Sequence, residues 1–352
     1  MKSATWKKYE LNFKKPAGTS RGVILKKESY FIFLSDSKHP DVTGIGECGL
    51  LKGLSHDDKP EYEKILNEVC DKINMQHLED EELIEWPSIR FGYEMATIDL
   101  KNGGKRIFFP TDFTDKNAKM KINGLIWMAS FENMKLQIES KIAKGFDCIK
   151  LKIGAIDFDE EIELLKKIRK RFSNSDIEIR LDANGAFHKN EALEKLKRLS
   201  AFRIHSIEQP IKANQRHEMA LLCKNSPIDI ALDEELIGIH SIDQKLKLLT
   251  EIRPKYIILK PSFLGGIVAC NEWIKIAEAN QIKWWITSAL ESNVGLNAIA
   301  QWTYTLGNDM PQGLGTGQLY TNNFDSPLQI ENGNLIFNKS NKWNLNNLLN
   351  VE

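Results

Sequence analysis

The chain has 352 residues, of which 42% are hydrophobic and 27% are charged, and it contains only 11 prolines. A chain of this length forms one large domain or two, and this composition supports a sizeable core and argues against disorder. The 48 basic residues balance the 48 acidic ones. Zero formal charge argues against a mainly electrostatic binder, so we expect a soluble protein with no nucleic-acid or membrane partner.

Cysteine usage and the N-terminus indicate the compartment. The five cysteines are far apart, odd in number and never in a C-x-x-C pattern, so neither a disulfide framework nor a zinc site is expected. The first residues, MKSATWKK, lack the apolar stretch of a signal peptide. No run approaches the roughly 18 apolar residues needed to span a bilayer. We expect a cytoplasmic protein.

The first hundred residues read as strands followed by helices. Apolar residues alternate with polar ones over 9–13, and apolar runs follow at 23–25 and 30–34, as in a short antiparallel meander. Apolar residues then recur at steps of three and four over 62–73, and 88–101 is a second helical candidate. This part of the chain is therefore predicted to be α+β.

From about residue 121 onward, short β-rich runs alternate with amphipathic helical segments. The runs cover residues 122–128, 148–153, 177–181, 204–207, 228–232, 256–259, 284–287 and, weakly, 313–314. About eight such units in about two hundred residues point to a parallel barrel rather than an open sheet. The Asn-rich end from Asn338 is interpreted as a surface tail or an edge strand.

Polar residues end these apolar runs, where the active site of a parallel barrel lies. Lys150 and Lys152 share one face, because side chains repeat every two residues along a strand. A single strand-end acid is more often a helix cap or a surface charge, but three in register with lysines favour one shared site. The residues expected at this mouth are Lys150, Lys152, Asp182, Asn184, Glu208, Asp233, Glu234, Lys260 and Ser288.

These residue types point to one kind of chemistry. Asp182, Glu208 and Asp233 would form an anionic, oxygen-rich site of the type that holds Mg²⁺. A lysine with another cation two residues away has its protonated form disfavoured, so Lys152 is a candidate general base near neutral pH. A metal would stabilise negative charge on a substrate carboxylate. We expect proton abstraction next to a carboxylate, through an enediolate.

Five short patterns carry a family resemblance. They are K-x-K, D-x-N, E-Q-P, D-E and K-P-S, beginning at Lys150, Asp182, Glu208, Asp233 and Lys260. At these residues the chain resembles the enolase superfamily, whose members use a lysine or histidine base with Mg²⁺. The second lysine on the sixth strand is similar to the muconate lactonizing subgroup. Details at 46–55, 259–266 and 288–292 resemble the o-succinylbenzoate synthase family.

The resemblance implies a fold. Residues 116–318 would form a modified TIM barrel, (β/α)7β, that carries the catalytic groups. Residues 1–115 would form an α+β capping domain, and residues 319–352 would return to that cap. The fold class is therefore α/β.

The resemblance also implies roles. Asp182, Glu208 and Asp233 would bind Mg²⁺, with Mn²⁺ able to substitute. Lys152 would remove the proton and then protonate the departing hydroxyl, while Lys260 steadies the enediolate. The implied supporting residues are Lys150, Asn184 and Glu234 beside the metal ligands, Ser262, Gly265 and Ser288 near the succinyl end of the substrate, and covering loops around Ser20-Arg21 and Leu51–Leu54.

The implied function is that of a Mg²⁺-dependent hydro-lyase. Its small-molecule carboxylate substrate would be 2-succinyl-6-hydroxy-2,4-cyclohexadiene-1-carboxylate, dehydrated to o-succinylbenzoate in menaquinone biosynthesis. Two alternatives stay open: a racemase or epimerase of N-succinylamino acids or dipeptides, and an inactive barrel that acts as a binding protein. Dipeptide epimerases usually carry D-x-D after the last strand, whereas this chain has Gly-Leu-Gly-Thr at 313–316.

Other patterns receive structural interpretations. Residues 44–49 match G-x-G-x-x-G, but no helix opens on the last glycine, so we interpret them as a turn or capping loop rather than a dinucleotide site. The seven histidines show no ligand spacing, which favours solvated or core roles. Trp127 and the pair Trp284-Trp285 are interpreted as barrel packing rather than a substrate wall.

Overall fold

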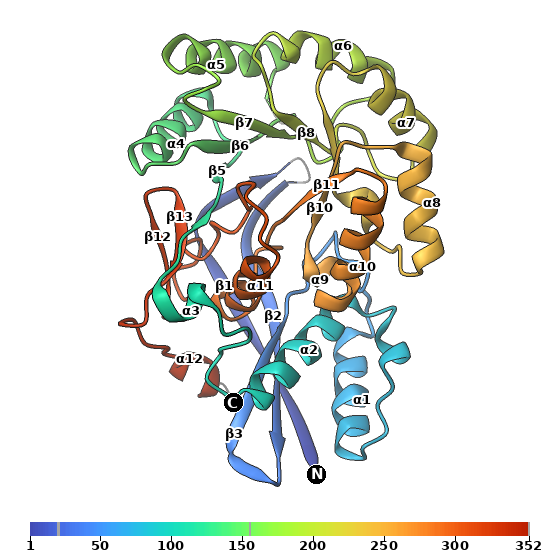
Figure 1. Ribbon diagram of the computed structural model, residues 1–352, viewed down its shortest axis with the longest axis vertical. Helices are drawn as coiled ribbons and strands as arrows, with labels where there is room; N and C mark the ends of the chain where they lie inside the picture. The colour runs from blue at the N-terminus through green and yellow to red at the C-terminus, as the bar shows by residue number, and fades with distance from the viewer. Residues whose placement is uncertain (20–21, 155, 351–352) are drawn as a thin grey trace.

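Seven of the apolar runs form one parallel sheet in the computed structural model, which describes residues 1–19, 22–154 and 156–350 (Figure 1). The strand order, β11-β10-β9-β8-β7-β6-β5, follows the chain without a crossover. The strands are β5 (Gly124–Ile126), β6 (Cys148–Lys152), β7 (Glu178–Asp182), β8 (Ser206–Glu208), β9 (Ile230–Leu232), β10 (Tyr256–Leu259) and β11 (Lys283–Ile286).

Residues 312–313 occupy the eighth position of the sheet. Gln312 forms a parallel bridge with Ile122, and Gly313 forms one with Thr287. These bridges join the two ends of the seven-stranded sheet through two residues, which explains why the last run was weak in the sequence. The predicted α/β fold with a parallel barrel is confirmed.

Helices follow the strands and cover the outside of the barrel (Figure 1). In α5 the residues Ile162, Leu165 and Ile168 form a buried stripe, while acids occupy the first turn and basic residues the last, as the helix dipole favours. The helices are α4 (Phe131–Ala143), α5 (Phe158–Arg171), α6 (Lys189–Ser200), α7 (Arg216–Asn225), η2 (Glu234–Leu236), α8 (Ile242–Ile252), α9 (Pro261–Leu264), α10 (Gly266–Ala279) and α11 (Asn293–Thr305).

A separate antiparallel sheet lies below the barrel in Figure 1, flanked by two helices. The predicted runs at 23–25 and 30–34 lie in one strand, β2, so their separation was wrong. The strands also run further than predicted, because polar residues continue the β1–β2 ladder beyond its buried part. The elements are β1 (Lys2–Thr19), β2 (Gly22–Asp36), β3 (His39–Cys48), α1 (Tyr62–Asn74), η1 (Asp80–Leu83), α2 (Pro87–Lys101) and α3 (Asp112–Lys116). We call residues 1–115 the cap.

The glycine-rich segment lies in β3, so its interpretation as a turn or loop was wrong. A Cβ at Gly44 would lie 2.1 Å from Ala96 O, and one at Gly46 would lie 1.8 Å from Gly92 O. The glycines therefore allow β3 to pack directly on the backbone of α2. No helix begins at Gly49, in agreement with the rejection of a dinucleotide site.

The C-terminal segment is built into both parts of the molecule. Strands β12 (Leu328–Glu331) and β13 (Asn334–Phe337) form a small sheet with β4 (Met120–Lys121). Beyond them, Leu345 and Leu348 pack with Phe31 of the cap, and α12 (Asn346–Leu349) ends the described chain. The interpretation of the end as a surface tail or edge strand was wrong, because two leucines anchor it.

Buried carboxylates join the cap to the barrel. Glu47 in β3 accepts hydrogen bonds from Ser292 N and Gly295 N, both at 2.9 Å, at the start of α11. Glu94 in α2 accepts from Ile267 N at 2.6 Å and Val268 N at 3.1 Å at the start of α10. Each carboxylate thereby satisfies backbone donors that a helix start leaves open.

Two further observations concern the whole described chain. The cysteines within it form no disulfide, and all but Cys223 are buried. Over residues 1–19, 22–154 and 156–350, none of the helices has the length and apolar character that crossing a membrane requires.

Candidate active site

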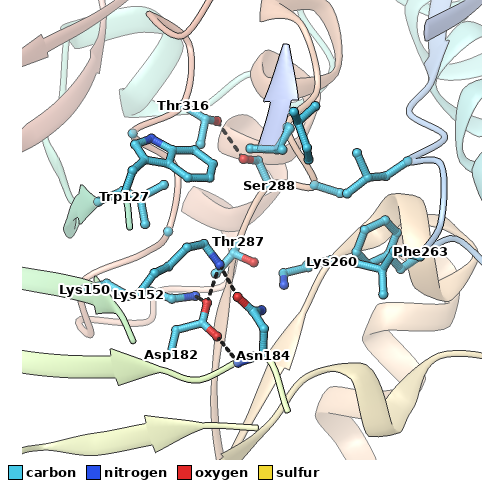
Figure 2. A pocket seen from close by; sticks show the side chains of 18 of the residues that line it. Trp127, Lys150, Lys152, Asp182, Asn184, Lys260, Phe263, Thr287, Ser288 and Thr316 are labelled. Carbon is cyan, nitrogen blue, oxygen red and sulfur yellow. Dashed lines mark hydrogen bonds and ion pairs between the residues drawn. The ribbon is translucent and has the colours of Figure 1, made fainter. Parts of the chain in front are cut away.

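A cavity of about 420 Å³ lies where the barrel strands end and the cap covers them (Figure 2). The barrel contributes three lysines, the acid Asp182 and small polar residues from the strand ends, and the cap contributes residues 22–24 and Leu51–Leu54. The predicted covering loop Leu51–Leu54 therefore lines the cavity. The other predicted loop, Ser20-Arg21, lies outside the described residues.

Lys152 is the last residue of β6 and lines the cavity. Its Nζ donates to Asp182 Oδ2 at 2.9 Å and to Asn184 Oδ1 at 2.6 Å. The ammonium group also lies 6.0 Å from the centre of the Trp127 ring. Lys152 is thus oriented by an acid and an amide while remaining at the cavity wall (Figure 2).

Lys150 lies one pleat deeper and is held by two acids. Its Nζ lies 3.0 Å from Asp182 Oδ2 and 2.6 Å from Glu208 Oε2. Burial alone would lower the pKa of Lys150, but Asp182, Glu208 and Asp233 outweigh burial and raise it. Burial alone would raise the pKa of Asp182, but Lys150, Lys152 and Lys260 outweigh burial and hold that pKa below its usual range. Both Lys150 and Asp182 are therefore charged.

Lys260 follows β10 and reaches the site from the opposite side (Figure 2). It forms an ion pair with Asp233, and its Nζ lies 3.7 Å from Glu208 Oε1. Burial opposes ionisation of Lys260, but Asp233 and Glu208 raise its pKa above the ordinary value. Two lysines, Lys152 and Lys260, thus bracket the cavity floor.

Three carboxylates come from neighbouring strands. Asp182 ends β7, Glu208 ends β8 directly beside it in register, and Asp233 follows β9. All three are almost fully buried, and within the described chain no group hydrogen-bonds to Glu208 Oε1. Buried carboxylate oxygens are the donors that Mg²⁺ prefers, so the residues present suit that ion.

Asn184 and Glu234 connect two of these strand ends. Asn184 Nδ2 donates to Glu234 Oε1 at 3.1 Å, while Asn184 Oδ1 accepts from Lys152. Asn184 has a φ of 44°, in the left-handed region that asparagine tolerates better than most residues. The Asn184 side chain therefore links Glu234 to Lys152 through two hydrogen bonds.

The three residues predicted at the succinyl end differ in their placement. Ser288 lines the cavity and its Oγ lies 2.6 Å from Thr316 Oγ1. Ser262 is fully buried and donates to Glu291 Oε1 at 2.5 Å, and Gly265 lies between α9 and α10 as the N-cap of α10. Within the described residues that line the cavity, Ser288 is present and Ser262 and Gly265 are absent.

Several lining residues were missed by the sequence analysis. Trp127 lines the cavity, so its interpretation as packing was wrong, whereas Trp284 and Trp285 are buried as expected. Trp127 directly follows the end of β5, the same position relative to its strand as the predicted polar residues. Asn123 and Phe263 lie in sequence contexts that gave no signal, whereas Thr287 ends a predicted apolar run and Thr316 ends the quoted segment 313–316.

Comparison with known proteins identifies the family. A sequence profile described as "Enolase C-terminal domain-like" matches residues 133–340, more than half of the chain. The chain belongs to the enolase superfamily. This superfamily member is 46% identical to o-succinylbenzoate synthase from Desulfotalea psychrophila, over 94% of its own length and 97% of that protein.

Solved structures agree with this assignment. The crystal structure of MenC from Desulfotalea psychrophila matches with a TM-score of 0.83 and 41% identity, covering 95% of this enolase superfamily chain and 99% of that one. Muconate lactonizing enzyme from Pseudomonas fluorescens matches with a TM-score of 0.82 and 22% identity, covering 99% and 97%. The first match supports the predicted family resemblance, and the second shows the fold.

Proposed function

We propose that this chain is a hydro-lyase that converts 2-succinyl-6-hydroxy-2,4-cyclohexadiene-1-carboxylate to o-succinylbenzoate, a step of menaquinone biosynthesis in the cytoplasm. The observation that carries this proposal is the 46% identity to an o-succinylbenzoate synthase along nearly the full length of both proteins. The site supports the same chemistry, because two lysines bracket a cavity above three buried carboxylates.

In the proposed mechanism Lys152 moves the proton. Its Nζ takes the proton from the carbon next to the substrate carboxylate and then gives it to the hydroxyl group, which leaves as water. Mg²⁺, held by Asp182, Glu208 and Asp233, would stabilise the negative charge on that carboxylate. Lys260 supplies positive charge from the opposite side, and the new double bond completes the aromatic ring.

The surrounding residues hold this arrangement. Asp182 and Asn184 fix Lys152 through hydrogen bonds of 2.9 and 2.6 Å, so its Nζ is positioned before substrate binds. Lys150 balances Asp182 and Glu208 from within the barrel. Leu51–Leu54 and Trp127 limit the access of water to the cavity, and Ser288 with Thr316 offers hydroxyl groups to the succinyl end.

A second candidate reaction uses the same two lysines. Because Lys152 and Lys260 approach the cavity from opposite sides, one could remove and the other return a proton on the same carbon, as racemization of an N-succinylamino acid requires. Exchange of the α-hydrogen for solvent deuterium in that substrate, with no turnover of the cyclohexadiene, would select this reaction instead.

Substitution of Lys152 by alanine tests the proposed base. We expect Lys152→Ala to lower the rate of cyclohexadiene dehydration by at least about 10²-fold, since a positioned base contributes about 10²–10⁴-fold. The rate is measured as loss of the substrate's ultraviolet absorbance with and without Mg²⁺. Circular dichroism and calorimetric Mg²⁺ titration establish that the variant still folds and binds the ion.

The matched control is Lys166→Ala, because Lys166 lies on α5 with 56% of its side chain exposed, and we expect full activity. Activity retained by Lys152→Ala would reject Lys152 as the base. A folded, Mg²⁺-binding wild-type protein that turns over neither the cyclohexadiene nor an N-succinylamino acid would instead favour a binding protein.

A further inference from the structure

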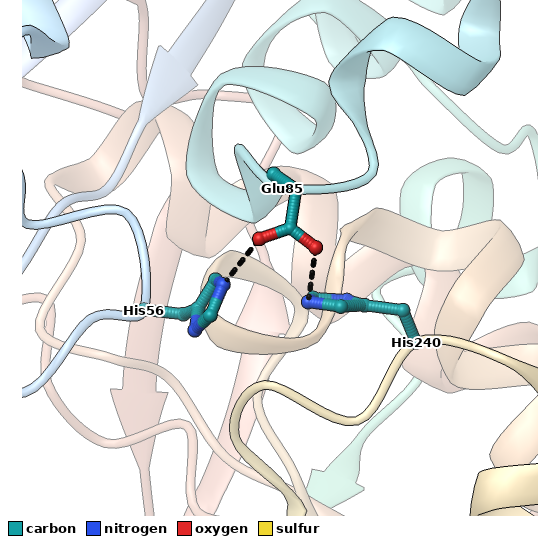
Figure 3. Close-up of side chains that lie close together, drawn as sticks. All are labelled: His56, Glu85 and His240. Atoms are coloured by element: carbon teal, nitrogen blue, oxygen red, sulfur yellow. Dashed lines mark hydrogen bonds and ion pairs between the residues drawn. The ribbon is translucent and has the colours of Figure 1, made fainter.

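Two histidines and a glutamate meet outside the cavity, at the junction of the cap and the barrel (Figure 3). His56 lies in the loop after β3, Glu85 lies just before α2, and His240 follows η2 of the barrel. These residues are far apart in the chain, so linear spacing could not reveal the group. The proposed mechanism uses none of them.

The three side chains point their polar atoms toward one another. His56 Nε2 lies 2.8 Å from Glu85 Oε2, and His240 Nε2 lies 3.7 Å from Glu85 Oε1. The centres of the two imidazole rings are 5.0 Å apart. One ligand atom from each residue lies within 4.8 Å of the other two, so side-chain adjustments of about 1 Å would suit a zinc ion with bonds of about 2 Å.

His240 carries an unsatisfied atom. Its Nε2 is buried, and no described residue forms a hydrogen bond with it, since Glu85 is too distant at 3.7 Å. A buried polar atom without a partner is costly and calls for an unseen partner such as an ion.

We propose that His56, Glu85 and His240 bind one divalent transition-metal ion, with Zn²⁺ as the best match. Two imidazoles and one carboxylate form a donor set that suits zinc, with water completing the tetrahedron. Mg²⁺ prefers oxygen donors, so the proposed centre differs in metal preference from the three carboxylates of the cavity. The ion would be shared by the cap and the barrel.

A bound ion at this position would connect two segments that lie close to the cavity. His56 directly follows the loop that covers the cavity, which is closed by hydrogen bonds of 2.9 Å from Leu51 N to Ser55 Oγ and from Ser55 N to Leu51 O. His240 follows η2, whose first residue comes directly after Asp233. A bound ion would therefore tie the covering loop to the segment that carries a proposed Mg²⁺ ligand.

Lys59 is a cation beside the proposed ion, and Lys245 is a second positive charge that acts on His240. The Nζ of Lys59 lies 3.7 Å from Glu85 Oε2 and 4.9 Å from the centre of the Trp86 ring. Replacement of this charge by the uncharged side chain in Lys59→Met should strengthen metal binding, because the repulsion between the ammonium group and the ion disappears.

The test is a titration of the full-length protein with Zn²⁺ after chelator treatment, in excess Mg²⁺ so that the carboxylate centre is filled. We expect one equivalent of Zn²⁺ by calorimetry, and a visible absorption band when Co²⁺ replaces it. His240→Gln and Glu85→Gln should bind at least about 10–100-fold more weakly, the loss caused by removing even a supporting partner of a metal site. The exposed His39 provides the control His39→Gln, which should bind normally.

A second measurement separates binding from folding. Zn²⁺ should raise the Tm of the wild-type protein and of His39→Gln but not that of Glu85→Gln, whose side chain is 58% exposed, so that the fold tolerates the change. The proposal is overturned if the wild-type protein binds no stoichiometric Zn²⁺ or if both ligand variants bind as tightly as the wild-type protein.

Discussion

Lys150 and Lys152 share a strand face but have different surroundings. Lys150 contacts two carboxylates, whereas Lys152 contacts one carboxylate and the neutral Asn184. The two lysines also share Asp182 Oδ2, at 3.0 and 2.9 Å. Lys150 is therefore suited to balancing the acids, and Lys152, at the cavity wall, is suited to exchanging a proton with substrate.

Glu208→Gln tests the proposed metal set at the scale of one residue. The amide keeps the shape but removes the charge that would bind Mg²⁺ and that pairs with Lys150 at 2.6 Å. We expect Mg²⁺ affinity to fall at least about 10-fold, the lower range for perturbing a metal site. Calorimetric titration measures it, with the exposed Glu160→Gln as control. Equal affinity in both variants would remove Glu208 from the metal set.

The elements show which features local patterns can predict. Helices α1 and α2 and the barrel strands were predicted within a few residues, because the spacing of their apolar residues matches the face that each element buries. The lengths of β1 and β2 were not predicted, because the exposed parts of these strands show no apolar periodicity. Trp127, the anchored C-terminus and the histidine group were missed because tertiary contacts between distant segments create them.

Gly46→Ala tests the close contact between β3 and α2. The new Cβ would lie 1.8 Å from Gly92 O, so strand and helix must separate. We expect the free energy of unfolding to fall by more than about 3 kcal/mol, the upper end of the usual cost of overpacking. Urea unfolding measures this loss.

Gly124→Ala is the matched control for this contact. There the nearest atoms, at 3.1 Å, belong to the flexible Lys141 side chain, so we expect a clearly smaller loss. Similar losses in both variants would show that contact with the α2 backbone is not the cause.

At the scale of the whole molecule, the active cavity depends on the relative position of the cap and the barrel. Glu47 and Glu94 connect helix starts of the barrel to the cap at two separate places. Each such hydrogen bond contributes about 1.5–3 kcal/mol while the carboxylate that accepts it is ionised. These two connections hold the cap in place against the barrel.

Glu94 makes the stability of this junction depend on pH. Burial raises the pKa of Glu94 from 4.5 to about 7, so the folded protein holds a proton that the unfolded chain releases between these values. This contribution is fully present below pH 4.5 and is lost as the pH rises through 7. Relative to Glu94→Gln, the wild-type protein should lose about 2–3 kcal/mol of unfolding free energy between pH 5 and 8.

Urea unfolding of both proteins at pH 5, 6, 7 and 8 measures this difference, because groups common to both cancel. The variant Glu68→Gln, on the solvent side of α1 with 48% of its side chain exposed, should run parallel to the wild-type protein. Parallel curves for Glu94→Gln as well would mean that Glu94 has an ordinary pKa in the folded protein.

Strand β1 contacts residues between 320 and 349. Phe13 bridges to Tyr320, Asn12 N donates to Asn322 Oδ1 at 2.8 Å, and Lys7 Nζ donates to Leu349 O at 2.8 Å. A ribosome delivers the N-terminus first, so β1 can form these contacts only after residues 320–349 have been synthesised. The cap therefore completes these contacts only after all the barrel strands have been synthesised.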